Sequence, residues 1–238
     1  MKLTVLLPTK NEVLNIENLI DRINKLNIKE ELDILVIDDF STDGTRELLG
    51  QLELVTPNLN IVLRSNLDSS IASAYSEGYE WARKNQSTWV IQLDSDGQHD
   101  PDSLPKFIEL INTNEYALII GSRYCEGGKI NGWSNTRKLI SKSANLIFRL
   151  STRSKQVKDA TSGYRAIKLD LFLDKIVFES KYFSVHAELV KIIMRKNLSI
   201  IEVPIIFSSR HTGFSKMTTR SAVESLKLFA KWRFESVK

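Results

Sequence analysis

The chain has 238 residues, of which 42% are hydrophobic and 26% charged, a composition typical of a soluble globular protein. Cys125 is the only cysteine, which excludes an intrachain disulfide and favours a reducing compartment. The first apolar stretch is interrupted by Pro8, so it does not resemble a signal peptide. No apolar run approaches the ~18 residues of a transmembrane helix, and we therefore expect a soluble or peripheral membrane protein.

The formal net charge of +4 is unevenly distributed. Residues 123–168 contain eleven lysines and arginines but only Glu126 and Asp159 as acids, and residues 205–238 are also basic. This asymmetry indicates a face directed toward phosphate groups, anionic lipid or nucleic acid. A basic run that only forms a solvated surface is the alternative.

The first half of the chain alternates between predicted strands and helices. The pattern predicts strands at 3–7, 32–37, 61–63, 89–93 and 117–120, and helices at 14–26, from about 42, at 70–84 and at 101–113. Repeated β–α units with apolar strands predict an α/β fold with a mainly parallel sheet and helices on both faces. Such a sheet binds ligands beyond the carboxyl ends of its strands.

The segment that follows the predicted strand 89–93 carries the strongest functional signal. The apolar run ends in Asp94 and Asp96, and Asp100 with Pro101 is a typical helix start. Carboxylates placed in this way suit Mg²⁺ or Mn²⁺, which bind through one or two carboxylates plus substrate phosphates. An acidic turn before a helix is the simpler alternative.

Two common nucleotide-binding motifs are absent. No Gly-x-Gly-x-x-Gly follows the first strand and no Gly-x-x-x-x-Gly-Lys-Ser/Thr occurs, which argues against dinucleotide and P-loop sites. Phosphates would have to be held by a metal and by basic side chains. After the second strand, Asp38 and Asp39 could cap the next helix, as Ser41 or Asp43 could, or Asp39 could bind a nucleoside.

Several segments follow one another in a familiar order. They are Pro-Thr-Lys-Asn-Glu (8–12), Val-Ile-Asp-Asp-Phe-Ser-Thr-Asp-Gly-Thr (36–45), Leu-Asp-Ser-Asp-Gly-Gln-His-Asp-Pro (93–101), Gly-Ser-Arg-Tyr (121–124), Glu-Gly-Gly (126–128), Trp133 with Arg137, Thr-Ser-Gly-Tyr-Arg-Ala (161–166), Glu-Val-Pro-Ile (202–205) and Arg-His-Thr-Gly-Phe-Ser-Lys (210–216). This succession resembles the family 2 glycosyltransferases of GT-A fold, and among them the dolichyl-phosphate mannose synthases and polyprenyl-phosphate glycosyltransferases.

The resemblance implies a GT-A catalytic domain over residues 1–217, built as a three-layer α/β sandwich with a mainly parallel central sheet. Residues 218–238 are expected to form a basic amphipathic helix that belongs to this domain or docks onto a membrane or a partner. Two segments depart from the family pattern. Residues 68–72 replace the usual Gly-Leu-Gly-like turn, and Lys10 replaces a commonly aromatic residue.

The resemblance also implies a pocket for a nucleotide sugar. The positions that match its nucleoside-binding part are Pro8, Lys10, Glu12, Ile37 and Asp39. The positions that match its diphosphate-binding part are Asp94, Ser95 and Asp96, with Asp94, Asp96 and Gln98 as metal ligands and with Arg210 and Lys216 as cations on a loop. The positions that match residues facing the acceptor phosphate are Arg123, Arg137 and Ser141. The catalytic residues implied in this way are Asp94, Asp96, Arg123 and Arg137.

The implied reaction is a metal-dependent, inverting transfer of a sugar, with mannose favoured, from a nucleotide sugar to a polyprenyl or dolichyl phosphate. GDP-mannose is the favoured donor, and UDP-glucose is the alternative. A phosphate monoester has a second pKa of ~6 and is already ionised at neutral pH, so it needs arginines rather than a general base. We accordingly interpret His99 as a local hydrogen-bond partner, and His186 and Glu188 as structural residues.

Residues 133–150 and 223–234 interleave apolar and basic side chains. Helices of this kind lie at an anionic membrane surface or pack on their own domain, and docking onto a small membrane-anchoring subunit is a third option. We expect a peripheral protein at the cytoplasmic face of a membrane. Two other functions stay open: transfer to a sugar hydroxyl of a surface glycan, and a non-catalytic binding module. No RNA-stacking motif supports a nucleic-acid partner.

Overall fold

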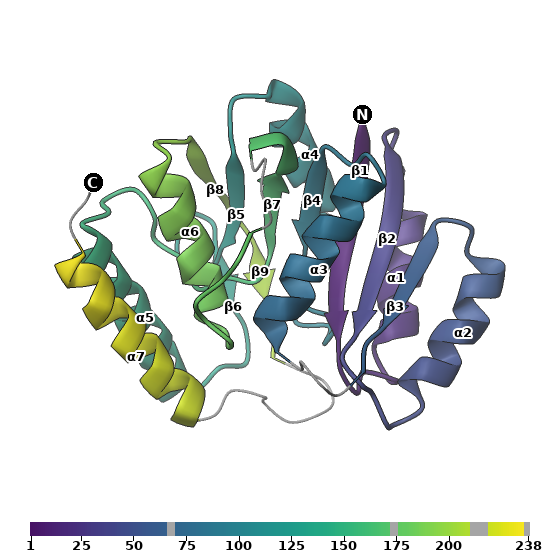
Figure 1. Cartoon of the computed structure of the whole chain (residues 1–238), viewed down its shortest axis with the longest axis horizontal. Helices are drawn as coiled ribbons and strands as arrows, with labels where there is room; N and C mark the ends of the chain where they lie inside the picture. Colours follow the sequence, from purple (N-terminus) through teal and green to yellow (C-terminus); the bar gives the residue numbers. More distant parts are fainter. Residues whose placement is uncertain (66–69, 172–175, 210–218, 236–238) are drawn as a thin grey trace.

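A seven-stranded sheet with the strand order β3-β2-β1-β4-β7-β5-β8 forms the centre of the molecule (Figure 1). The computed structural model describes residues 1–65, 70–171, 176–209 and 219–235, with side chains from residue 223 onward in the last segment. All strands of this sheet run in one direction except β7, which is antiparallel to both of its neighbours. The strands are β1 (Lys2–Thr9), β2 (Glu31–Asp38), β3 (Leu59–Leu63), β4 (Trp89–Gln92), β5 (Leu118–Ser122), β7 (Arg165–Lys168) and β8 (Ile200–Pro204).

Helices cover both faces of the sheet (Figure 1). One face carries α1 (Ile16–Lys25), α2 (Thr45–Val55) and α4 (Leu104–Thr113), which share a buried cluster with alternate residues of the strands. The other face carries α3 (Ile71–Lys84), α5 (Asn135–Thr152), α6 (Val185–Arg195) and α7 (Thr219–Phe234). The remaining elements are the short helices η2 (Pro101–Ser103) and η3 (Leu169–Leu171) and a small sheet of β6 (Lys129–Ile130) and β9 (Ile206–Phe207).

The alternating side chains of β1 show why helices cover both faces of the sheet. Leu3, Val5 and Leu7 lie in the cluster under α1 and α4, whereas Leu6 lies in the cluster under α3. Because side chains of a strand point alternately to opposite faces, an uninterrupted apolar strand needs a helical layer on each side. The predicted three-layer α/β sandwich with a mainly parallel central sheet is thereby confirmed.

The predicted element bounds need two corrections. The helix predicted from about residue 42 begins at Thr45, because Gly44 has a φ of +98° and the Asp43 carboxylate accepts a hydrogen bond from the Thr45 N–H at 3.1 Å. The strands β7 and β8 were not predicted. β7 has only four residues and begins and ends with a basic side chain, Arg165 and Lys168, which hides its apolar pattern.

The C-terminal helix α7 packs against the domain through two aromatic residues. Phe229 and Trp232 are buried, and their rings lie 5.9 and 6.4 Å from the ring of Phe148 in α5. Other apolar residues of α7, such as Leu226, are exposed. The helix therefore combines a buried aromatic face with an exposed apolar one, and the boundary expected near residue 217 stays a prediction.

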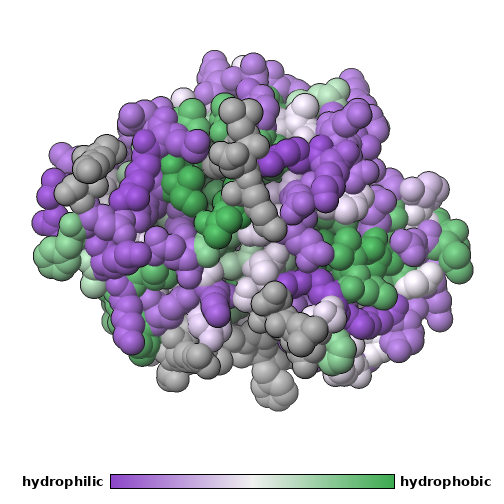
Figure 2. Space-filling view, viewed as in Figure 1, coloured by the Kyte–Doolittle hydropathy of each residue, from purple (hydrophilic) through white to green (hydrophobic). Residues whose placement is uncertain are grey.

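The surface drawn in Figure 2 is mostly hydrophilic. One hydrophobic area lies over the end of α2 and the edge strand β3, where Leu54, Val55 and Leu63 are exposed (Figure 2). No helix within the described part of the chain is long and apolar enough to cross a bilayer.

Candidate active site

Loops that follow β1, β2 and β4 meet at the carboxyl edge of the sheet, the lower edge in Figure 1. The Ser95 hydroxyl donates a hydrogen bond to the Pro8 carbonyl at 2.9 Å, and the Asn11 N–H donates to the Ser41 hydroxyl at 2.8 Å. The Asp39 N–H donates to the Thr9 carbonyl at 2.8 Å. Three of the loops predicted to form a site are therefore joined directly to one another.

The Asp39 carboxylate is held by two cations. The Arg64 Nη1 lies 2.8 Å from Asp39 Oδ1, and the Lys10 Nζ lies 3.7 Å from Oδ2. Arg64, which follows β3, was not anticipated, and it also contacts Ser73 of α3 at 2.6 Å. A carboxylate oriented in this way has acceptor oxygens at a fixed place, which is what recognition of a nucleoside requires.

Neighbouring residues have different roles from Asp39. The Asp38 carboxylate is buried and accepts hydrogen bonds from the Ser41 N–H and from Arg46, so Asp38 organises the turn after β2. The side chain of Ile37 is fully buried in the core, so this predicted nucleoside-binding residue can offer only its backbone to a ligand. The Glu12 carboxylate is buried and accepts from the Asn15 side chain at 2.8 Å.

The loop after β4 is fixed by its own side chains. The Asp96 Oδ1 accepts a hydrogen bond from the Gln98 N–H at 3.0 Å, and the Gln98 Nε2 donates to the Ser208 carbonyl at 3.0 Å. The Asp94 N–H donates to His99 Nδ1 at 3.1 Å. The interpretation of His99 as a local hydrogen-bond partner is confirmed, and Asp100 caps η2 as the sequence indicated.

The donor atoms of this loop fit a hard divalent cation. Asp94, Asp96 and Gln98 offer only carboxylate and amide oxygens, the ligands that suit Mg²⁺ and Mn²⁺. Within the described residues, no group of three or more histidine, cysteine or acidic residues forms a closed metal site. A bound ion would therefore need further ligands, such as substrate phosphates, beside the oxygens of this loop.

The absence of a side chain at Gly163 leaves space for the Asp94 carboxylate. A Cβ at this position would lie 2.9 Å from Asp94 Oδ1, and the Gly163 carbonyl is held by the Gln92 side chain at 3.2 Å. We expect Gly163→Ala to displace the carboxylate by a few tenths of an ångström and to lower kcat/KM about tenfold. Gly50→Ala is the control. A Cβ there meets nothing within 4 Å, so this variant should keep the activity of the parent. Equal activity of the two variants would contradict the placement of Asp94 in the site.

Arg123, predicted to face an acceptor phosphate, forms a buried ion pair with Asp159. The Asp159 carboxylate accepts from the Arg123 backbone N–H at 2.9 Å, from Nε at 2.8 Å and from Nη2 at 2.7 Å. Burial alone would raise the pKa of Asp159, but the Arg123 charge and these hydrogen bonds hold it below its usual value. Most of the guanidinium is committed to this pair, and Nη1 has no partner in the described part of the chain.

Aromatic rings connect Arg123 to the other proposed groups. The guanidinium carbons of Arg123 and Arg137 lie 5.5 and 4.0 Å from the ring centre of Trp133. The Phe207 ring lies 5.4 Å from Arg123 and 5.0 Å from the ring of His99. Cation–π contacts of this kind orient a guanidinium group.

Arg137 and Ser141 lie in the first turns of α5, and Ser134 caps this helix by accepting from the Arg137 N–H at 3.2 Å. Ser141 lies close to Tyr124, whose ring centre is 5.6 Å from the Arg123 guanidinium carbon. The structure thus brings Arg123, Arg137 and Ser141 together. Arg210 and Lys216, together with residues 68 and 69 of the divergent turn, lie outside the described residues.

Two buried histidines predict a pH-dependent stability. Burial lowers the pKa of His99 to about 4 and holds that of His186 well below its usual value. Below pH 6.5 the unfolded chain takes up protons that the folded chain does not, so the free energy of unfolding falls as the pH decreases. From pH 7 to pH 5 we expect a loss of about 2 kcal/mol for each histidine, measured by urea denaturation. His99→Gln should remove about half of this loss, and a pH-independent stability would contradict the buried neutral state.

Comparison with known proteins identifies the family. The family model described as "Glycosyl transferase family 2" matches residues 4–174 of this chain. The chain belongs to glycosyltransferase family 2. Among curated relatives, polyprenol monophosphomannose synthase of Mycolicibacterium smegmatis is 30% identical over 96% of this chain and 85% of its own. Undecaprenyl-phosphate mannosyltransferase of Micrococcus luteus is 31% identical over 98% of this chain and 94% of its own.

Other matches agree with this assignment. Dolichol-phosphate mannosyltransferase of Pyrococcus furiosus is 33% identical, and this chain spans 62% of its length. Among solved structures, glucosyl-3-phosphoglycerate synthase of Mycobacterium tuberculosis in complex with Mn²⁺, UDP and glucosyl-3-phosphoglycerate has a TM-score of 0.69 at 19% identity. That match covers 98% of this chain and 79% of the other. The family 2 chain described here is therefore a glycosyltransferase of GT-A fold, as the motif order indicated.

Proposed function

We propose that this glycosyltransferase transfers mannose from GDP-mannose to a polyprenyl or dolichyl phosphate in one inverting displacement. The observation that carries the proposal is the pair of guanidinium groups, Arg123 and Arg137, that both lie against the Trp133 ring. Two oriented arginines match the oxygens of a phosphate. The mannosyltransferase names of three relatives that act on polyprenol-type phosphates agree with this acceptor.

The groups around Arg123 favour a phosphate acceptor over a hydroxyl acceptor. Asp159 is paired with Arg123, and the Glu202 carboxylate accepts from the backbone N–H groups of Lys158 and Asp159 at 3.0 and 2.7 Å. His99 Nδ1 already accepts a hydrogen bond, so the neutral ring carries its proton on Nε2 and cannot take up another there. A hydroxyl acceptor needs a general base, whereas an ionised phosphate needs only to be held in place.

On the donor side, Asp94, Asp96 and Gln98 would hold a divalent cation, with Mg²⁺ and Mn²⁺ equally compatible with their oxygens. When bound, such an ion supplies Lewis-acid stabilisation of the charge on the departing diphosphate. Asp39, fixed by Arg64 and Lys10, would accept hydrogen bonds from the nucleoside. Arg210 and Lys216 are proposed to contact the diphosphate on the strength of the motif alone.

We further propose that the enzyme works at the cytoplasmic face of a membrane, with α5 and α7 against the lipid. α5 contains four basic residues and no acid, and it exposes Leu139, Ile140, Leu146 and Leu150. α7 lies beside α5 (Figure 1) and exposes Val223 and Leu226. Exposed apolar side chains between basic ones suit the interface of an anionic bilayer, and docking onto a small membrane-anchoring subunit would use the same surface.

The proposed reaction is tested with purified protein, Mg²⁺ or Mn²⁺, a panel of nucleotide sugars and two acceptors, a short-chain polyprenyl phosphate and the matching polyprenol. We expect a product from the phosphate and none from the alcohol, with GDP-mannose the best donor. A preference for UDP-glucose would correct the donor only. Failure with every donor, in a preparation shown to be folded, would overturn the proposed acceptor.

A further inference from the structure

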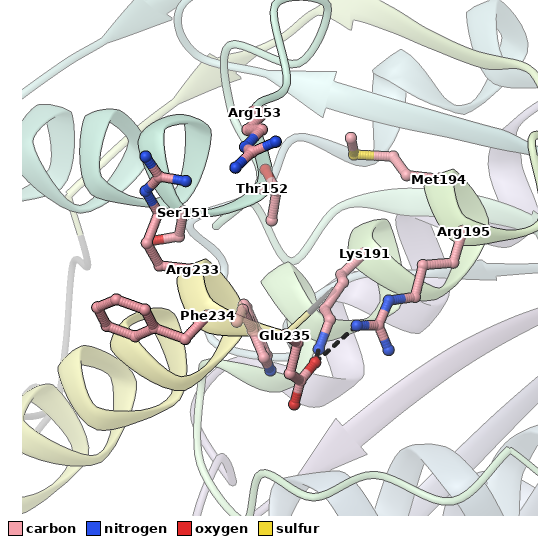
Figure 3. A pocket seen from close by; sticks show the side chains of 10 residues that line it. Ser151, Thr152, Arg153, Lys191, Met194, Arg195, Arg233, Phe234 and Glu235 are labelled. Atoms are coloured by element: carbon pink, nitrogen blue, oxygen red, sulfur yellow. Dashed lines mark hydrogen bonds and ion pairs between the residues drawn. The ribbon is translucent and has the colours of Figure 1, made fainter. Parts of the chain in front are cut away.

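A cavity of about 810 Å³ lies between the C-terminal ends of α5, α6 and α7 (Figure 3). The loops of the active site follow the strands at the lower edge of Figure 1, whereas α5 and α7 end near the upper left of the same view. None of the residues that line the cavity belongs to the site described above. Its volume is within the range of small-molecule sites in proteins.

The cavity carries an excess of positive charge. Arg153, Lys191, Arg195 and Arg233 line it, and Glu235 is the one carboxylate among the lining residues. The carbonyl ends of three helices add roughly half a negative charge each. The balance is therefore about +1.5, so the helix ends alone do not account for the cations.

The charges are arranged in two groups. The Glu235 Oε2 lies 2.6 Å from Lys191 Nζ and 2.7 Å from the Arg195 Nη2. Arg153 and Arg233 lie away from this group, toward the top and left of Figure 3. They line the cavity and form no ion pair within the described residues. A ligand would thus meet two guanidinium groups whose charge is not already neutralised.

The indole of Trp232 provides a second, independent indication. Trp232 lines the cavity and is 3% exposed, yet its Nε1–H is buried and has no acceptor in the described part of the chain. A buried donor without a partner costs about 1–3 kcal/mol. This nitrogen has almost no accessible surface, so an acceptor oxygen from a ligand would reach it only after the surrounding side chains move slightly. The same ring receives Lys191 Nζ at 4.5 Å.

The backbone conformation of Arg153 also supports a binding site in this cavity. Arg153 has a φ of +57°, a left-handed conformation in which the C-terminal ends of helices usually place glycine or asparagine. At the ends of α4 and α6 the residues with this conformation are Asn114 and Asn197, and just after α3 it is Gln86. At α5 an arginine occupies it despite the strain, and its side chain lines the cavity.

We propose that this cavity binds a phosphate ester through Arg153, Arg233 and the Trp232 N–H. Leu150 of α5 is 62% exposed and directly precedes Ser151, which lines the cavity. Phe234 of α7 is 88% exposed and itself lines the cavity. Apolar side chains at the rim of a phosphate site suit a phospholipid whose headgroup enters the cavity. A soluble phosphate ester shares the same headgroup chemistry.

The proposal is tested with the double variant Arg153→Gly and Arg233→Ala. Glycine fits the left-handed backbone, so the first substitution removes the side chain without adding strain. The control is Lys29→Ala with Lys106→Ala, which removes the same charge from exposed residues elsewhere. Binding is measured by co-sedimentation with phosphatidylcholine vesicles that contain or lack phosphatidylglycerol, and by calorimetry with glycerol 1-phosphate.

We expect the cavity variant to lose about tenfold in affinity for the anionic vesicles or for glycerol 1-phosphate, and the control to lose less than twofold. Loss with vesicles alone assigns the site to a lipid headgroup, and loss with glycerol 1-phosphate assigns it to a soluble ester. Trp232→Phe should reproduce part of the loss. Equal losses in the cavity and control variants, or no binding of either probe, would overturn the proposal. Transfer to a short-chain acceptor in detergent should be unchanged, which separates this site from the catalytic one.

Discussion

Asp96→Asn should reduce sugar transfer at least about 1000-fold without unfolding the protein. The Asp96 side chain is buried, and its Oδ1 accepts the Gln98 N–H at 3.0 Å, a hydrogen bond that the asparagine oxygen can still accept. What the substitution removes is the negative charge available to a divalent cation. Stabilisation of a departing diphosphate by such an ion is worth several kcal/mol, and about 4 kcal/mol corresponds to a 1000-fold change in rate.

The matched control is Asp102→Asn, in the short helix η2 that follows the same loop. The Asp102 carboxylate is exposed and lies 3.0 Å from Arg22, a surface ion pair worth at most about 1 kcal/mol. Transfer should be unchanged in this variant. Binding of Mn²⁺, followed by electron paramagnetic resonance, should weaken in the Asp96 variant only. If Asp96→Asn kept transfer within tenfold of the parent, Asp96 would not be a ligand of a catalytic ion.

The parts of the site that follow buried strands could be predicted from the sequence. A run such as Trp89–Gln92 is buried on both faces and is soon followed by acidic residues, which places Asp94 and Asp96 at the carboxyl edge of the sheet. The fold of the first half follows from the same regularity, because each of the strands β1 to β4 is succeeded by a helix. Periodicity is a local property, and local properties can be derived from the chain itself.

Partners that are distant in sequence could not be predicted. Arg123 and Asp159 are 36 residues apart, and nothing in either segment indicates that one neutralises the other. Arg165 was counted among the basic residues of the surface, which is wrong, since it is fully buried. Its guanidinium is satisfied by the carbonyl groups of Ala160, Ser162 and His186, partners that no charge pattern identifies.

The buried pair of Arg123 and Asp159 predicts the largest effect on stability. Asp159→Asn should destabilise the protein by about 3–5 kcal/mol, because it leaves the Arg123 guanidinium in a buried place without its counter-charge. The amide group of asparagine would also present N–H donors to the N–H groups of Arg123. Urea denaturation of the variant at pH 7 measures the loss. A destabilisation below about 1 kcal/mol would contradict the burial of the pair.

The double variant Arg123→Met with Asp159→Leu separates the two roles of Arg123. Replacement of both charges by apolar groups should cost less than either single substitution, since no uncompensated charge remains buried and only the Arg123 backbone N–H loses its acceptor among the groups of this residue. If Arg123 serves only the fold, the recovered stability should restore sugar transfer as well. If its Nη1 holds the acceptor phosphate, the double variant should be stable and still transfer at least about 100-fold more slowly, mainly through a higher KM for the lipid phosphate. Stability and transfer therefore change together in the first case and separately in the second, and we expect the second.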